Sequence, residues 1–161
     1  MRKRTVVLAV CLILAAGLSC TACGKKESAD KLEGNLSDII VSLYENAELD
    51  AEFREGLAYF DTIEITDDQE SYILGTDEIT YTEGVVSMPM MSSVPYQCVL
   101  LRVDEADVET AKQLLKDNAD PNKWVCVTAE TVLIESRGDV IFFIMSGKDV
   151  AYAMNTAFQN L

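Results

Sequence analysis

Histidine is absent from this chain of 161 residues. Its absence removes the most common general base, the most common metal ligand and every Ser–His or Cys–His catalytic pair. The sequence also has no phosphate-binding glycine loop, no dinucleotide-binding fingerprint and no paired-cysteine zinc motif. We therefore expect a protein that is not an enzyme and that has no cofactor and no bound metal ion.

Basic residues are also scarce, with 13 Lys and Arg against 27 Asp and Glu. Loss of the first 22 residues would remove three bases and no acid, so the mature charge would be 10 − 27 = −17. Nucleic-acid phosphates require a basic face, so this charge argues against a nucleic-acid partner. It also disfavours electrostatic attraction of the domain to an anionic membrane, and it is more typical of a surface that keeps a protein soluble.

Long apolar runs are limited to Val6–Leu18, which is shorter than the ~20 residues of a membrane-spanning helix. This run follows Arg2-Lys3-Arg4 and precedes small residues and a cysteine, which is the pattern of a bacterial lipoprotein export signal. We interpret residues 1–22 as the signal peptide and Cys23 as the lipidated residue, with Cys20 as the alternative. The pattern predicts a protein at the outer face of the cytoplasmic membrane, with the membrane as a partner through its N-terminal lipid anchor.

Residues 23–34 contain the lipidated cysteine and a polar segment that we expect to be a flexible linker. Residues 35–161 are enough for one domain with its own core. Apolar spacing and turn residues predict helices at 36–47, 66–74, 104–120 and 150–161, a weaker helix or turn at 53–60, and strands at 78–88, 96–103, 131–136 and 140–145. Gly84 is expected to form a turn or bulge.

The order of these elements indicates the α+β class. Short connections favour antiparallel neighbours, and the apolar stripes of the helices need an apolar sheet face to pack on. We expect a two-layer sandwich, in which a mainly antiparallel sheet of about four strands packs against helices. Arg137-Gly138-Asp139 spells an adhesion tripeptide, but it separates two apolar strands, so we interpret it as a hairpin turn.

The segment Met88-Pro89-Met90-Met91-Ser92-Ser93 is the most unusual part of the domain. Three thioethers this close together are soft ligands that suit Cu(I). We favour the interpretation that Met90 and Met91 fill an irregular part of the core where the proline bends the strand connection. A third interpretation is an exposed recognition groove, in which Met88, Met90, Met91, Ser92 and Ser93 contact a ligand or a partner.

Two further features concern single residues. Trp124 either covers the edge of the core, which we favour, or stands exposed as a contact for a partner. Cys98 and Cys126 both have apolar neighbours, and we expect two buried free thiols. A disulfide between them is the alternative, since an extracytoplasmic location permits one.

Several motifs occur together in a fixed order: Met90-Met91-Ser92-Ser93, Val99-Leu100-Leu101-Arg102-Val103, Asn118-Ala119-Asp120-Pro121-Asn122-Lys123-Trp124, and Arg137-Gly138-Asp139 leading into Ile144-Met145-Ser146. In this order they resemble a family of small lipoproteins of clostridia-like Gram-positive bacteria, which is catalogued as the domain of unknown function 4358. The resemblance covers roughly Leu36–Phe158, and the signal ending Thr-Ala-Cys-Gly is similar as well. It implies a single lipid-anchored domain, and it implies no activity and no catalytic residues.

These observations favour a lipid-anchored, non-enzymatic binding or interaction module at the cell envelope. Its partner would be an envelope protein or a small ligand of unknown identity. One alternative is an envelope hydrolase that uses carboxylates or a serine such as Ser92 or Ser93. A second alternative is a lipoprotein that binds a small molecule or a metal ion.

Overall fold

The computed structural model describes residues 31–161. Its elements in chain order are α1 (Leu36–Asn46), α2 (Ala51–Gly56), the 3-10 turn η1 (Leu57–Tyr59), β1 (Phe60–Glu64), α3 (Glu70–Ile73), β2 (Glu83–Pro89), β3 (Gln97–Arg102), α4 (Val108–Asn118), β4 (Thr131–Arg137), β5 (Val140–Ser146) and α5 (Lys148–Asn160). Within this part of the chain, no helix has the length and apolar character needed to cross a membrane. The predicted signal peptide and both candidate lipidation residues, Cys20 and Cys23, lie outside the described residues.

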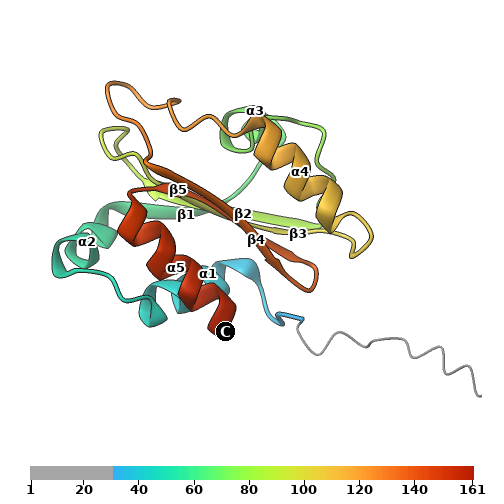
Figure 1. Cartoon of the computed structure of the whole chain (residues 1–161), viewed down its shortest axis with the longest axis horizontal. Coiled ribbons are helices and arrows are strands. Elements are labelled where there is room, and N and C mark those ends of the chain that lie inside the picture. The colour runs from blue at the N-terminus through green and yellow to red at the C-terminus, as the bar shows by residue number, and fades with distance from the viewer. Residues whose placement is uncertain (1–30) are drawn as a thin grey trace, which may run out of the picture.

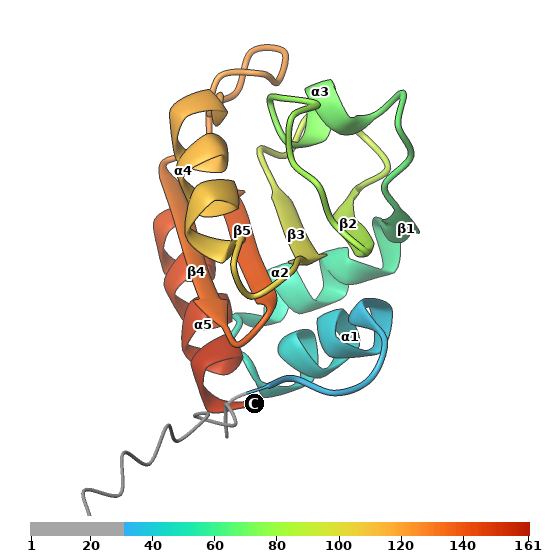
Figure 2. The ribbon, with the colours of Figure 1, turned by 90° about the vertical axis from the view of Figure 1, so that its right-hand side faces the viewer.

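The five strands form one antiparallel sheet in the order β1-β2-β3-β5-β4 (Figure 2). Neighbouring strands β2 and β3, and likewise β4 and β5, are joined by short turns. Helix α4 carries the chain from β3 past β5 to the edge position of β4. The turn between β4 and β5 contains Gly138 at φ 55°, so the predicted hairpin is confirmed.

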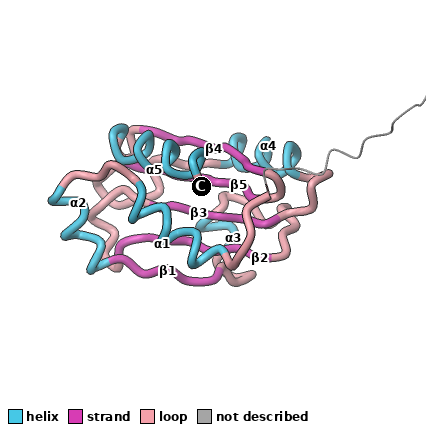
Figure 3. The backbone as a smooth tube through the Cα atoms, turned by 90° about the horizontal axis from the view of Figure 1, so that it is seen from below, coloured by secondary structure: helices cyan, strands magenta, loops and turns pink. Residues whose placement is uncertain are grey.

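Helices cover both faces of the sheet (Figure 1). Helices α1 and α5 cross one face (Figure 3), and α3 and α4 lie on the other. Side chains of β5 alternate between the two resulting cores: Phe142 packs in the α1–α5 core and Phe143 in the α3–α4 core. A strand with two covered faces has no solvent side, and this explains why every residue of β5 is buried.

The predicted α+β class and antiparallel sheet are confirmed, and the sheet gains one strand over the expected four. Residues Phe60–Glu64 form the edge strand β1, where the sequence indicated only a helix or turn ending at Phe60. Apolar side chains alternate too weakly in this short segment to predict a strand, because an edge strand is largely exposed. The helices on the second face add a layer to the sandwich.

Strand β2 begins at Glu83, later than the predicted residue 78. Before it, Ile79 is buried in the α3–α4 core, and the Tyr81 hydroxyl donates to Glu70 Oε1 at 2.7 Å. Gly84 lies inside the strand rather than at a turn or bulge, paired with Leu101. A Cβ atom at position 84 would come within 2.8 Å of the Tyr81 ring, so glycine is required here by a close approach.

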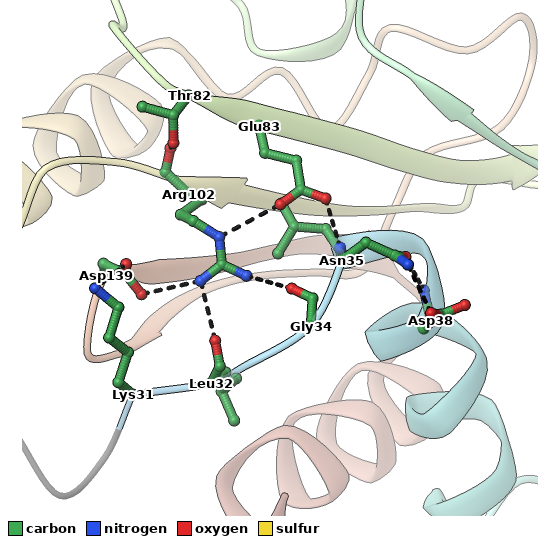
Figure 4. A network of polar contacts seen from close by, with 10 residues as sticks. Lys31, Leu32, Gly34, Asn35, Asp38, Thr82, Glu83, Arg102 and Asp139 are labelled. Atoms are coloured by element: carbon green, nitrogen blue, oxygen red, sulfur yellow. Dashed lines mark hydrogen bonds and ion pairs between the residues drawn. The ribbon is translucent and has the colours of Figure 1, made fainter.

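The described chain begins with a segment fixed to the domain by Arg102 on β3 (Figure 4). Its guanidinium donates to the carbonyls of Leu32 and Gly34 at 3.0 and 2.8 Å. Lys31 pairs with Asp139 at 2.8 Å, and Leu32 is buried. The last four residues of the predicted linker 23–34 are therefore attached to the domain, and the rest of that linker lies outside the described residues.

Candidate functional site

The methionine-rich segment divides between two environments. Met90, Met91, Ser92 and Ser93 are exposed in the turn between β2 and β3. Met88 is partly buried on β2 and packs against the α3–α4 core. The interpretation that Met90 and Met91 fill the core is therefore wrong, and Met88 is not an exposed contact residue. Met88 therefore differs in exposure from Met90 and Met91, and the three thioethers do not share one exposed surface.

Trp124 is buried in the α3–α4 core at 8% exposure, which rules out its role as an exposed contact. Beside it, Lys123 donates to the Tyr72 carbonyl at 2.7 Å and to Gln97 Oε1. Its ammonium also lies 4.3 Å from the Tyr72 ring centroid and 5.4 Å from the Trp124 ring. Burial lowers the pKa of Lys123 to about 8. These contacts fix the 119–129 loop to α3, a structural role.

The two cysteines of the domain are both free thiols. Cys98 is buried, as expected, and burial raises its pKa to about 12. Cys126 is exposed, so the expectation that it is buried is wrong. It occupies a left-handed backbone conformation at φ 65° in a loop, where its apolar neighbours in the sequence do not enclose it.

The exposed methionines belong to an apolar surface at one end of the domain. Their neighbours come from α2, η1 and β1, which pack against the β2–β3 turn. The strongly exposed members are Tyr59 (66%), Met90 (59%), Met91 (67%) and Val94 (42%). Val94 lines a groove of about 380 Å³ together with Phe53, Phe60, Gly56, Asp50 and Glu52. Tyr59, Met90 and Met91 lie on the chain segments next to it, because Phe60 pairs with Pro89 and the Met90 amide donates to the Tyr59 carbonyl. We call these six apolar residues, Phe53, Tyr59, Phe60, Met90, Met91 and Val94, the distal apolar surface.

Aromatic packing gives this groove a firm floor. The Phe53 ring lies 5.6 Å from the Phe60 ring and 5.4 Å from that of Tyr96, and the Phe60 and Tyr96 rings are 5.0 Å apart. Tyr96 is fully buried and shares a 2.9 Å hydrogen bond with the hydroxyl of Tyr44. Tyr44 in turn donates to Ser87 Oγ at 2.8 Å. The floor is therefore tied to both α1 and β2.

Helix α2 is held in place by Arg54, whose guanidinium donates to the carbonyls of Tyr44, Ala47 and Leu49 at 3.2, 2.6 and 3.2 Å. Asp50 caps the helix, because its Oδ1 accepts from the Phe53 amide at 2.7 Å. The β2–β3 turn is attached to the same region, since the Met90 amide donates to the Tyr59 carbonyl at 2.9 Å. The elements that carry the distal apolar surface are thus joined to one another directly.

The charged side chains in the groove of this surface are all acidic. The groove lining holds two carboxylates, Asp50 and Glu52, and no basic side chain. Between Arg54 and Arg102 the sequence contains no Lys or Arg, and five of the six residues of the surface lie in this stretch. Arg54 is exposed and keeps its charge, but it is not in the groove lining, because its guanidinium is bound to three backbone carbonyls. The surface therefore combines exposed apolar side chains with a negative rim.

A second depression, of about 730 Å³, lies between the end of α1 and α5. Its lining is largely polar and includes Asn46, Glu48, Asp149, Thr156 and Asn160. Although it is larger, it contains none of the residues that the sequence singled out. Exposed large apolar side chains within it are limited, among the described residues, to Tyr152 and Leu161. We therefore regard the distal apolar surface as the better candidate.

Ser92 and Ser93 lie beside Met91 on an exposed turn. In the described part of the chain, neither hydroxyl is hydrogen-bonded to a carboxylate or an amine that could act as a base. The same residues 31–161 contain no group of three or more Cys, Asp or Glu side chains arranged to hold a metal ion. The geometry therefore offers no support for serine hydrolysis at this turn.

The methionines were the sequence signal that pointed to this surface, and the aromatic contribution of α2, η1 and β1 was missed. Phe53, Tyr59 and Phe60 lie some thirty positions earlier in the sequence, and only the antiparallel pairing of Phe60 with Pro89 brings them to the turn. In comparisons with known proteins, no family model, no curated protein and no solved structure matches this chain.

Proposed function

We propose that this chain is a lipid-anchored extracytoplasmic interaction module, which binds its partner through the distal apolar surface and has no catalytic role of its own. The observation that carries the proposal is a groove with an aromatic floor that Val94 lines, with the exposed side chains of Tyr59, Met90 and Met91 on the adjoining η1 and β2–β3 turn. Contiguous exposed apolar patches on soluble domains mark interaction sites, because such area is costly to leave in water. The resemblance to the lipoprotein family of unknown function supports the same conclusion about the anchor.

The positions of the chain start and of the surface support this arrangement. Strand β2 runs from Glu83, next to the docked segment 31–34, to Pro89, next to the distal apolar surface. Figure 1 shows α2 at the end of the domain away from the point where the described chain begins. A chain anchored through Cys23 would therefore present the surface away from the membrane.

In-cell photo-crosslinking tests the interaction. A photo-reactive amino acid replaces Met91 in the full chain, and a matched control replaces Glu109, whose side chain is 85% exposed on α4. We expect specific adducts from position 91 and none from position 109. If position 91 yields no adduct while both variants are expressed and folded to the same extent, the proposed function fails.

Metabolic labelling with palmitate tests the anchor independently. We expect label on the wild-type chain and its loss in a Cys23→Ala variant. A Cys20→Ala variant serves as the control and should keep the label. Loss of label only in the Cys20→Ala variant would move the anchor to Cys20, and an unlabelled wild-type chain would contradict the lipoprotein proposal.

A further inference from the structure

The charge of the distal apolar surface restricts the chemistry of what can bind there. An occupant has to place an apolar group against Phe53, Phe60 and Val94 in the groove. Its flanking groups then face Asp50 and Glu52, with no basic side chain in the lining. Complementary potentials favour association and opposed ones suppress it, so positive charge beside the apolar group is favoured.

A second copy of this chain is a poor occupant by this criterion. In a symmetric pair the same surface would face itself, so Asp50 and Glu52 of one copy would approach those of the other. Arg54 keeps its positive charge, but its guanidinium is directed to the carbonyls of Tyr44, Ala47 and Leu49 and does not line the groove beside Asp50 and Glu52. The charge of −17 expected for the mature chain (10 − 27) adds repulsion at longer range.

The membrane is a poor occupant for two reasons. Its anionic headgroups repel the carboxylates at the rim. The tether is also short: from Cys23 to the docked Lys31, eight residue steps span at most ~26 Å at ~3.3 Å each. A compact domain of this size is roughly 36 Å across. The chain starts at one end and the apolar surface lies at the other, so the tether is too short to turn that surface onto the membrane.

We infer that the distal apolar surface binds a cationic amphipathic segment of another extracytoplasmic protein, with an apolar side chain in the groove and Lys or Arg residues beside Asp50 and Glu52. This inference rests on the proposed function and adds to it the class of partner. Exposed thioethers suit this role, since unbranched methionine side chains adapt their shape to the apolar face of a helix or peptide.

Two designed peptides test the inference on the full-length chain in detergent. They share one helical pattern of Leu and Phe, and the flanking positions are Lys in one and Glu in the other. Fluorescence anisotropy of labelled peptide measures the affinities. We expect the Lys peptide to bind at least about tenfold more tightly than the Glu peptide and to weaken as salt rises.

Variants of the surface separate specific binding from general attraction to an acidic protein. Met91→Ser and Glu52→Lys should each lower the affinity for the Lys peptide by about tenfold. Two control variants should change this affinity little. They are Val125→Ser, at an exposed apolar position in another loop, and Glu109→Gln on α4. Equal effects of the surface variants and the controls would overturn the inference, and so would equal binding of the two peptides.

The crosslinked peptide from position 91 provides a second test, which distinguishes the two proposals. A partner segment with an apolar residue flanked by net positive charge supports the inference. An acidic or neutral segment, a second copy of this chain or a lipid adduct overturns it. A protein segment of the wrong charge still leaves the proposed interaction function standing, whereas the absence of any adduct removes that function itself.

Discussion

The Arg102 guanidinium and the Asp139 carboxylate lie 3.2 Å apart and join β3 to the β4–β5 turn where the chain enters the domain. Both side chains are largely buried, at 17% and 7% exposure. Because the same guanidinium binds the Leu32 and Gly34 carbonyls, the pair attaches the incoming segment as well as the hairpin. Glu83 completes the network, accepting from Arg102 Nε at 3.3 Å and from the Leu36 amide at 2.7 Å.

Replacing Arg102 with Met should destabilise the domain by about 3 kcal/mol, because it leaves a nearly buried carboxylate with one remaining ionic partner. It should also increase hydrogen exchange at the Leu36 amide, since Glu83 loses the group that positions it. Urea unfolding measures the first effect and exchange detected by mass spectrometry the second. The control, Glu109→Gln, removes an exposed 3.5 Å ion pair with Lys112 and should cost less than about 0.5 kcal/mol. If the two variants lose the same free energy of unfolding, the proposed role of Arg102 is wrong.

Tyr44 connects α1 to the floor of the groove, so Tyr44→Phe should affect both stability and peptide binding. The variant loses hydrogen bonds to Ser87 and Tyr96, both buried, at a cost of about 1–2 kcal/mol. Thermal unfolding measures the change. Tyr152→Phe, at a half-exposed position on α5, is the matched control and should lie within about 0.5 kcal/mol of wild type. A Tyr44→Phe variant as stable as that control would show that the hydroxyl network contributes nothing.

The sequence predicted those elements whose side chains follow a clear period. Helix α1 was expected at 36–47 and occupies Leu36–Asn46, because its apolar residues recur at helical spacing. The β4–β5 hairpin was equally clear, since Gly138 separates two apolar runs. Strand β5 is apolar at nearly every position, which indicates two covered faces, but this feature alone does not say which helices cover them.

The candidate site was predicted in part. Met90 and Met91 were singled out by composition, and both are exposed rather than in the core as favoured. Met88 and Trp124 were also named, but strand alternation and core packing turn both side chains inward. Phe53, Tyr59 and Phe60 could not have been connected to the turn, because their proximity depends on the edge strand β1. The Arg54 contacts to three carbonyls depend on how α1 ends, and no residue pattern encodes this.

Gly84→Ala tests the close approach of Tyr81 to β2. The new methyl group would lie 2.8 Å from the Tyr81 ring and 3.1 Å from Leu101, so we expect a loss of about 1–3 kcal/mol. Gly56→Ala is a matched control in α2, where nothing lies within 4 Å of the added atom. In a helix this second change should be neutral or stabilise by up to about 1 kcal/mol. If denaturant unfolding gives both variants the same stability, the proposed packing at Gly84 is wrong.

The two thiols of the domain should differ sharply in reactivity. Cys126 is exposed, whereas Cys98 is buried and its pKa is raised to about 12, so little thiolate forms there near neutral pH. With iodoacetamide under native conditions, we expect peptide-resolved mass spectrometry to find label on Cys126 at least about a hundredfold faster than on Cys98. In denaturant the two rates should converge. Comparable native rates would contradict the burial of Cys98 against Tyr96.

Lys123 provides a test based on pH. Its pKa falls from 10.5 to about 8 because burial penalises the charged ammonium. Between these two values the unfolded chain holds a proton that the folded chain has released, so this group adds stability as pH rises through the window and adds none below it. We therefore expect wild type to gain stability relative to Lys123→Met as pH increases from about 8 to 10.5. The variant also loses the contacts to Tyr72 and Gln97, which lowers its stability by an amount that does not depend on pH. Denaturant unfolding across this range measures the gain. Lys148→Met, at an exposed position on α5, is the control that corrects for the titration of other groups. If the difference in stability between wild type and Lys123→Met does not change with pH, the ammonium of Lys123 is not desolvated.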